Sequence, residues 1–316
     1  MSLTFEPVEG IPEVRSGDDI AAAIADRLTL AAGDVVVVTS KIVSKAAGLT
    51  TSRPKDELLA AETDRVVARR GQTAIVRTHQ GLTLAAAGID NSNTAPGTLV
   101  PLPRDPDESA SAIRSRLLAL TGIRVAVIIS DTAGRAWRIG QTDIAIGCAG
   151  LLPYDSYAGS TDPYGNALVV TAPAIADQIA GGAELASGKF GARPVVIVRG
   201  TDPDWLTEDD GPGARALIRD ESADLFGLGA REAAVAAILG NQPVRGLPAD
   251  DRTTVDDIID LALGGLDFHR SDVTVEGSTI VVSIDADRQV NAGVLAQRLV
   301  SLGVAHALPV NVRISS

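Results

Sequence analysis

Short runs of β-branched and apolar residues, separated by segments with helical periodicity, constrain most strongly what this chain can fold into. Val35–Thr39 is a continuous run of this kind, and Val125–Ile129 and Val195–Val198 resemble it. A strand that is apolar at every position is typical of a sheet interior covered by helices on both faces. The sequence therefore predicts an α/β (mixed α+β) fold with these three segments as buried strands.

Helical and strand patterns alternate along the rest of the first 240 residues. Asp18 and Asp19 place acidic side chains in the first turn of a predicted helix. Gln80-Gly81 separates two short apolar runs and predicts a hairpin. The further predicted elements are helices at Ile20–Leu30, 55–70, Ser109–Leu120 and Ala174–Ala186, hairpin strands at Ala74–Thr78 and Leu82–Ala86, and a strand at Leu168–Thr171.

A change in composition near residue 240 predicts two domains. Gly240-Asn241-Gln242-Pro243 is the best linker candidate in the 316-residue chain. We therefore predict a core at residues 1–240 and a small α/β module at 241–316. The module's predicted elements are helices at Val255–Leu263 and Val290–Leu302 and strands at Thr279–Ile284 and Pro309–Ile314.

Charge and composition exclude several classes of function. The formal net charge of -12 argues against a nucleic-acid partner, whereas a single nucleotide needs only a few local cations or backbone N–H groups. One cysteine, Cys148, excludes an intramolecular disulfide and a multi-thiolate metal site. His79, His269 and His306 show no zinc-binding spacing. Any metal is therefore expected to have oxygen ligands, as Mg²⁺ and Mn²⁺ do.

The N-terminal segment and the apolar runs predict no membrane partner. Residues 1–10 lack a basic region followed by an apolar stretch, which argues against a signal peptide. No apolar run reaches the roughly 18 residues that a bilayer span needs. We expect a cytoplasmic protein.

Four lysines stand beside 24 arginines, which we attribute to a codon bias of the genome. Two of them, Lys41 and Lys45, follow the strand Val35–Thr39, at the end where α/β sheets usually bind ligands. On a helix they would share one face and favour a bound polyanion. Two solvated surface lysines are an equally good interpretation of this segment alone.

A second polar segment follows the predicted strand Val125–Ile129. Asp131 and Thr132 could present a carboxylate and a hydroxyl to a metal beside phosphates, and Arg135 and Arg138 could clamp a phosphate or carboxylate. The alternative is an aspartate that caps a turn, with surface arginines. The polar and cationic sequence directly after a buried strand favours the functional interpretation modestly.

Two further segments are ambiguous by themselves. Asp90 and Asn93 could bind a metal and a base or ribose, but a plain turn explains Asp90-Asn91-Ser92-Asn93 better. Ser187–Pro194 contains Gly188-Lys189 but is not a P-loop, because Phe190 stands where Ser or Thr would bind Mg²⁺ and the segment follows a helix and precedes a strand. Its backbone N–H groups could still wrap phosphates.

Taken together, these segments resemble the coenzyme F420-0:γ-glutamyl ligase family over roughly residues 4–235. The resemblance depends on the number and order of the matching stretches, since each is weak alone. They are Val8–Val14 with Gly17–Asp19, Thr39–Lys45, Ala86–Asn93, Leu102–Asp107, Ser130–Arg135 with Trp137–Gly147, Asp162–Asn166, Ala174–Ala180 and Val198–Gly200.

The resemblance implies a two-subdomain ligase core with mixed sheets that joins L-glutamate to the carboxylate of coenzyme F420-0, with a further γ-linked glutamate added later. It implies GTP as co-substrate, an acyl phosphate intermediate, two Mg²⁺ or Mn²⁺ ions, K⁺ as a further ion, and a homodimer. Asp90, Asp131 and Thr132 would be metal ligands, and Asp131, Arg135 and Arg138 would be catalytic. The implied nucleotide site comprises Ile11, Pro12, Glu13, Val14, Ser40, Lys41, Lys45, Asn93, Ser187, Gly188, Lys189, Phe190, Gly191, Ala192, Arg193 and Pro194.

This chain departs from the family pattern at three places. Ser187 stands where the family usually has Met before the glycine. Lys189 stands where archaeal relatives are expected to have Gln or Glu as a metal contact, so we assign it to the nucleotide loop. Residues 241–316 are too few for the flavin-binding reductase domain that some bacterial relatives carry. Two rival functions stay open: a ligase of the same chemistry acting on another carboxylate, and a non-catalytic GTP-binding accessory protein.

Overall fold

A computed structural model describes residues 2–92, 94–221, 223–239, 253–284, 288–306, 308 and 310–315. Contacts between residues divide the chain into two compact units, 1–218 and 219–316. Within the described residues, no helix has the length and apolar character that crossing a membrane requires.

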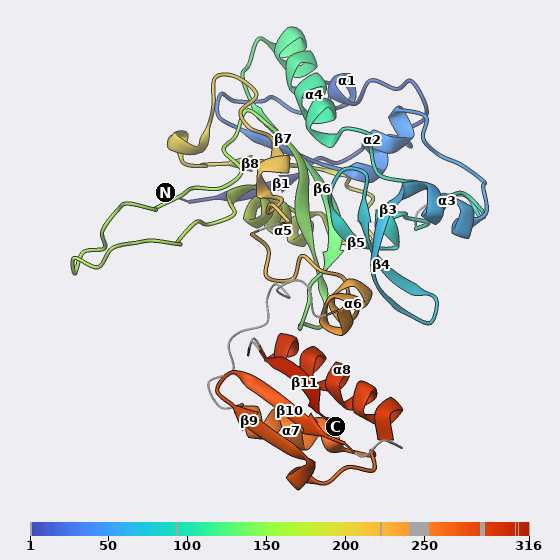
Figure 1. Ribbon diagram of the computed structural model, residues 1–316. Coiled ribbons are helices and arrows are strands. Elements are labelled where there is room, and N and C mark those ends of the chain that lie inside the picture. The colour runs from blue at the N-terminus through green and yellow to red at the C-terminus, as the bar shows by residue number, and fades with distance from the viewer. Residues whose placement is uncertain are drawn as a thin grey trace. The chain divides into compact units, whose positions relative to one another are not determined.

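A five-stranded sheet forms the centre of the first unit (Figure 1). Its strand order is β1-β8-β2-β6-β7. The middle strand, β2, runs parallel to β6 and antiparallel to β8. The five strands are β1 (Thr4–Pro7), β2 (Val35–Thr39), β6 (Ala126–Gly134), β7 (Gln141–Ala149) and β8 (Val195–Arg199).

Helices cover both faces of this sheet, which explains why β2 is apolar at consecutive positions. On one face, Val36 and Val38 share a core with α1 (Ile20–Ala25) and α4 (Pro106–Thr121). On the other face, Val35 and Val37 share a core with α5 (Ile175–Ser187). The predictions of a mixed α/β fold and of buried strands at these positions are therefore confirmed.

Capping residues explain the bounds of α4. Asp105 precedes the helix and accepts a hydrogen bond from the backbone N–H of Glu108 at 3.0 Å. Pro106 occupies the first turn, and Gly122 ends the helix with a left-handed φ of 71°. Both features are typical of helix ends, because Pro needs no N–H donor there and Gly accepts a positive φ without strain.

A second sheet of the first unit has the strand order β3-β4-β5. Its antiparallel strands are β3 (Thr63–Arg70), β4 (Thr73–Thr78) and β5 (Thr83–Ala85), and β4 and β5 confirm the predicted hairpin. The prediction of one helix over 55–70 was half wrong, because α3 ends at Glu62 and β3 follows it. Pairing with β4 decides the conformation of this charged segment, so tertiary contacts override its local helical pattern.

Three other differences from the sequence predictions have clear causes. The first helix ends at Ala25, where Asp26 provides its C-cap. Leu168–Thr171 is not a strand: Val169 and Val170 are 73% and 90% exposed on a long ribbon, residues 153–174, that extends from the sheet (Figure 1). Strand β7 escaped prediction because its first residues are polar.

The second unit is a small α/β module with its own core. Within its described residues the strand order is β11-β10-β9, with β10 parallel to β11 and antiparallel to β9. Ile258, Ile280 and Leu295 are among its fully buried residues. Its elements are α6 (Ala230–Leu239), α7 (Val255–Leu263), β9 (Val273–Glu276), β10 (Thr279–Ser283), α8 (Gln289–Ala305) and β11 (Asn311–Ser315).

The second unit begins before the predicted linker. Helix α6 packs against α8 and so belongs to this unit, although the sequence analysis placed residues 230–239 in the core. Gly240–Pro243, the predicted linker itself, lies outside the described residues.

Candidate active site

A cavity of about 400 Å³ lies where β2 ends and helix α2 (Ser40–Ala46) begins. Ligands of open α/β sheets usually bind at the carboxyl ends of strands, so this is the expected place for a site. Its wall comes from the N-terminal segment, from β2 and α2, from β6 and β7, and from the end of α5 with the loop that follows. The lining residues are Ile11, Pro12, Glu13, Val14, Val37, Thr39, Lys41, Ile42, Lys45, Ser130, Thr132, Asp143, Ala183, Glu184, Ser187, Gly188, Lys189, Phe190, Ala192, Arg193, Pro194 and Val196.

The structure therefore gathers most of the residues that were assigned to the nucleotide. Ser40 and Gly191 do not line the cavity but are next to residues that do. Asn93 lies outside the described residues. Three of the four lysines, Lys41, Lys45 and Lys189, line this one cavity.

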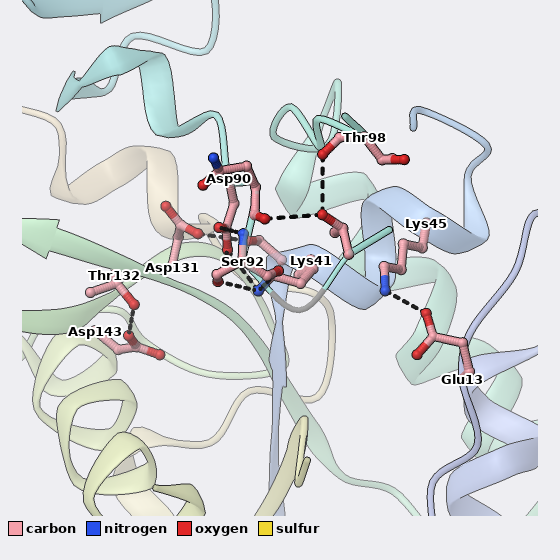
Figure 2. Close-up of polar contacts among 12 residues, drawn as sticks. Glu13, Lys41, Lys45, Asp90, Ser92, Thr98, Asp131, Thr132 and Asp143 are labelled. Atoms are coloured by element: carbon pink, nitrogen blue, oxygen red, sulfur yellow. Dashed lines mark hydrogen bonds and ion pairs between the residues drawn. The ribbon is translucent and has the colours of Figure 1, made fainter. Parts of the chain in front are cut away.

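Each lysine of α2 is paired with a different carboxylate (Figure 2). Lys41 Nζ lies 2.7 Å from Asp90 Oδ2 and donates to the backbone oxygen of Ser92 at 2.8 Å. Lys45 Nζ donates to Glu13 Oε1 at 2.6 Å. Both ammonium groups line the cavity, so an anion bound there would compete with these carboxylates for them.

Asp90 lies on a short antiparallel bridge to Val100, at the end of the segment that follows β5. Burial acts to raise the pKa of Asp90, but hydrogen bonds from Lys41 and Ser92 outweigh it and hold the pKa below its ordinary value. The carboxylate is therefore ionised at neutral pH.

Asp131 lies on β6 just beyond the end of β2, and its pKa is shifted upward, in the opposite direction to that of Asp90. Burial, together with the charges of Asp143 and Asp90, raises the pKa of Asp131 to about 7, although Ser40 and Lys41 oppose this shift. Ser40 Oγ donates to Asp131 Oδ1 at 2.7 Å. The ionised form of Asp131 is disfavoured overall, because burial and the two neighbouring carboxylates outweigh the effects of Ser40 and Lys41.

Asp143 on β7 is a candidate functional residue that the sequence analysis did not single out. It faces Thr132 across the β6–β7 ladder and lines the cavity. Its two carboxylate oxygens accept hydrogen bonds from Ser130 Oγ at 2.9 Å and from Thr132 Oγ1 at 2.8 Å, and Figure 2 shows the bond from Thr132. Because Thr132 donates its proton here, the lone pairs of its oxygen remain available to a ligand.

Glu184 on α5 is a second carboxylate that the sequence analysis missed. Its Oε2 accepts the backbone N–H of Asp143 at 2.9 Å, and its backbone oxygen accepts from the N–H of Gly188 at 3.0 Å. It therefore connects β7 with the loop Ser187–Pro194. The pairing of β7 with β6 brings Asp143 to the cavity, and the packing of α5 against β7 brings Glu184 there, so no local sequence signal could identify them.

Asp90 and Asp131 are close enough for the charge of Asp90 to raise the pKa of Asp131, and Thr132 follows Asp131 on β6. Asp131 and Thr132 are consecutive on β6, so their side chains point to opposite faces of the sheet. Among the described residues, no group of three or more His, Cys, Asp or Glu side chains is arranged to hold a metal ion. The chemistry of the donors fits a hard cation, since they are carboxylate and hydroxyl oxygens, and the positive charge of Lys41 does not outweigh burial and the neighbouring carboxylates at Asp131.

The loop Ser187–Pro194 closes one side of the cavity. Arg193 shapes it, because its Nε donates to the backbone oxygen of Ser187 at 2.9 Å and its Nη1 lies 3.4 Å from Glu9 Oε1. A Cβ at Gly191 would lie 2.3 Å from Arg193 Nε, so a larger residue would displace this guanidinium. Phe190 is 100% exposed.

Arg135 and Arg138 do not reach the cavity. Both are exposed on the tip of the β6–β7 hairpin, residues 135–140. Arg135 Nη2 donates instead to the backbone oxygen of Ile139 at 3.3 Å.

Comparison with known proteins places this chain in a family of ligases. The family model described as F420-0:Gamma-glutamyl ligase matches residues 10–55 and 52–200. Coenzyme F420:L-glutamate ligase of Methanopyrus kandleri is 38% identical over 247 residues, which cover 71% of this chain and 98% of that relative. The protein of the same name from Methanothermobacter thermautotrophicus is 38% identical over 253 residues, covering 72% of this chain and 99% of the relative. The chain belongs to the F420-0:γ-glutamyl ligase family, which confirms the resemblance.

Proposed function

We propose that this protein joins the amine of L-glutamate to the free carboxylate of coenzyme F420-0 and uses GTP as co-substrate. The observation that carries the proposal is the match to coenzyme F420:L-glutamate ligases over almost their whole length. The cavity supports it, because segments far apart in the sequence bring cationic and carboxylate groups together there. A further, γ-linked glutamate would be added by the same chemistry.

Amide formation from a carboxylate requires activation, because oxide is a poor leaving group. An oxygen of the F420-0 carboxylate attacks the γ-phosphorus of GTP, the bond to the bridging oxygen breaks, and GDP leaves. The glutamate amine then attacks the acyl carbon, phosphate departs, and the nitrogen loses a proton. Phosphoryl transfer depends on positioning and charge neutralisation, which are what ordered cationic groups provide.

The phosphates of GTP would bind to the cations of the cavity. Lys41, Lys45 and Arg193 are each held by a carboxylate, Asp90, Glu13 and Glu9 respectively. Incoming phosphates would replace these partners, so binding needs little reorganisation of the protein. Lys189 would add a fourth positive charge from the loop.

Asp90, Asp131 and Thr132 are the groups that would hold Mg²⁺ or Mn²⁺, with two such ions and K⁺ proposed in the complete site. Bound divalent ions would neutralise phosphate charge and polarise the transferred phosphoryl group. Asp143 would orient the Thr132 hydroxyl by accepting a hydrogen bond from it. A homodimer is proposed as the assembled form.

One incubation tests the proposal. The protein is mixed with F420-0, L-glutamate, GTP and Mn²⁺, and the products are followed by mass spectrometry together with GDP release. We expect GDP and a product heavier by one glutamyl unit. GTP binding without turnover would instead indicate an accessory protein, and turnover only with other carboxylates would indicate a ligase of different specificity.

A further inference from the structure

The tip of the β6–β7 hairpin, residues 135–140, displays two large apolar side chains to solvent. Trp137 is 92% exposed and Ile139 is 102% exposed. Large apolar side chains that lie close together on an exposed turn are candidates for a binding surface. The same tip carries two arginines, Arg135 and Arg138, in a chain with a formal net charge of -12.

The backbone of the tip is ordered in a conformation that displays Trp137. This residue has a φ of 63°, in the left-handed region that a bulky side chain rarely adopts. Two hydrogen bonds close the tip: Arg138 N–H donates to the backbone oxygen of Arg135 at 3.4 Å, and Arg135 Nη2 donates to that of Ile139 at 3.3 Å. Strained backbone of this kind is enriched at functional sites.

The tip is continuous with the cavity. Thr132 pairs with Asp143 at the cavity wall, and two further ladder pairs, ending with Gly134 and Gln141, lead directly to the tip. At about 3.3 Å per residue, Trp137 lies at most roughly 16 Å along the chain from Thr132. A small molecule that reacts beside Thr132 could therefore reach the tip with its other end.

We propose that this tip binds the acceptor of the proposed reaction, with the acceptor's aromatic ring stacked on Trp137 beside Ile139 and its phosphodiester held by Arg138. The inference rests on the proposed function. Coenzyme F420-0 carries a flat deazaflavin ring at one end and its reacting carboxylate at the other, joined by a chain that contains a phosphodiester. Tryptophan stacks well on such rings, and guanidinium groups pair with phosphodiester oxygens.

Direct binding is tested with a single-tryptophan protein. The chain has two tryptophans, so the Trp205→Phe variant leaves Trp137 as the only one. Titration with F420-0, without GTP or glutamate, is expected to quench the Trp137 fluorescence saturably. GTP alone is expected to leave it unchanged. Absence of quenching by F420-0 at saturating concentration overturns the proposal.

Steady-state kinetics separate this role from a structural one. Trp137→Ala is expected to raise KM for F420-0 about tenfold, with kcat and the KM for GTP unchanged, and Trp137→Phe is expected to restore most of the affinity. Arg138→Ala is expected to raise the same KM, with partial rescue by Arg138→Lys. The matched control is Tyr164→Ala, which removes an equally exposed aromatic, also 92% exposed, from the ribbon.

The outcomes distinguish the two proposals. If the wild-type protein turns over F420-0 while Trp137→Ala has an unchanged KM, the tip is not the acceptor site and the proposed function stands. If the wild type shows no turnover but F420-0 still quenches Trp137, the proposed function fails and the tip is supported as a binding site. If Trp137→Ala dissociates a dimer in sedimentation with an unchanged affinity for F420-0, the tip contacts a second copy and the proposal is overturned.

Discussion

Replacing Asp131 by asparagine is expected to stabilise the ligand-free protein at neutral pH and to remove most of the proposed activity. Burial is the main reason that the pKa of Asp131 is raised from 3.8 to about 7, so its ionised form is costly in the folded state. Asparagine has nearly the same shape and keeps a carbonyl oxygen that can accept the hydrogen bond from Ser40. Asparagine carries no charge, so the free-energy cost of holding an ionised carboxylate at this position disappears.

The size of the expected stabilisation follows from the difference between the pKa of Asp131 in the folded protein, about 7, and its ordinary value of 3.8. Each pKa unit corresponds to about 1.4 kcal/mol, so the folded protein at pH 8 bears up to about 4 kcal/mol of ionisation cost at Asp131. We expect about half of this in the measured free energy of unfolding, since the folded site can relax when it ionises. For a unit of this size, 2 kcal/mol corresponds to a rise in Tm of about 5 °C.

The stabilisation by Asp131→Asn is expected to increase with pH. Between pH 3.8 and about 7 the folded Asp131 keeps its proton while the unfolded chain has lost it, so the contribution of this group to stability falls as pH rises through that window. The advantage of Asp131→Asn should therefore be small at pH 4, grow up to pH 7, and be constant above it. Thermal unfolding followed by calorimetry in EDTA at pH 4, 5, 7 and 8 measures this profile.

A carboxylate with the opposite shift provides the control. A hydrogen bond from the Asn166 side chain, with backbone N–H bonds, lowers the pKa of Asp162 on the exposed ribbon. Asp162→Asn should therefore give no stabilisation that grows with pH. The reasoning is refuted if Asp131→Asn is no more stable than the wild type at pH 8, or if its advantage does not depend on pH. The metal assignment is refuted separately if the variant keeps near-normal ligase activity.

Other substitutions test the cavity and the fold around it. Lys41→Arg and Lys45→Arg should each weaken GTP binding about tenfold in calorimetry, because a planar guanidinium does not replace a compact ammonium at a fitted site; unchanged affinity and turnover would contradict the nucleotide assignment. Asp143→Asn should lower kcat about 10- to 100-fold and weaken Mn²⁺ binding measured by electron paramagnetic resonance, with KM for GTP little changed. Asp107→Ala should cost about 2 to 4 kcal/mol in urea unfolding, because Asp107 accepts the backbone N–H groups of Cys148 at 2.9 Å and Ala214 at 2.7 Å; a loss below 1 kcal/mol would show that water replaces these bonds.

Local pattern was sufficient for strands that are buried on both faces and for helices that bury one apolar face. The strands β2 and β8 and the helices α4, α7 and α8 lie close to their predicted positions, because continuous apolar runs and helical periodicity report burial directly. The segments around Lys41, Asp131 and Ser187–Pro194 were also found from sequence, since polar residues directly after a buried strand or helix are visible locally. The order of these segments was enough to indicate the family.

Pairing between distant segments decided the rest. Residues 63–70 are a strand because β4 pairs with them. Leu168–Thr171 bonds only to the other arm of the ribbon, where the N–H groups of Tyr157 and Gly159 donate to the backbone oxygens of Thr171 and Leu168, and it does not join a sheet. Asp143 becomes part of the cavity only through the ladder that sets it opposite Thr132.

The sequence by itself determined which segments are buried, the class of fold, the family and most of the cavity's cationic residues. Only the tertiary structure decided the partners of those residues: Lys41 with Asp90, Lys45 with Glu13, and Thr132 with Asp143. It also separated Arg135 and Arg138 from the cavity and placed them on an exposed tip with Trp137. The physical reason is that burial leaves a periodic signature along the chain, whereas the pairing of two charges depends on strand register and on contacts between residues far apart in sequence.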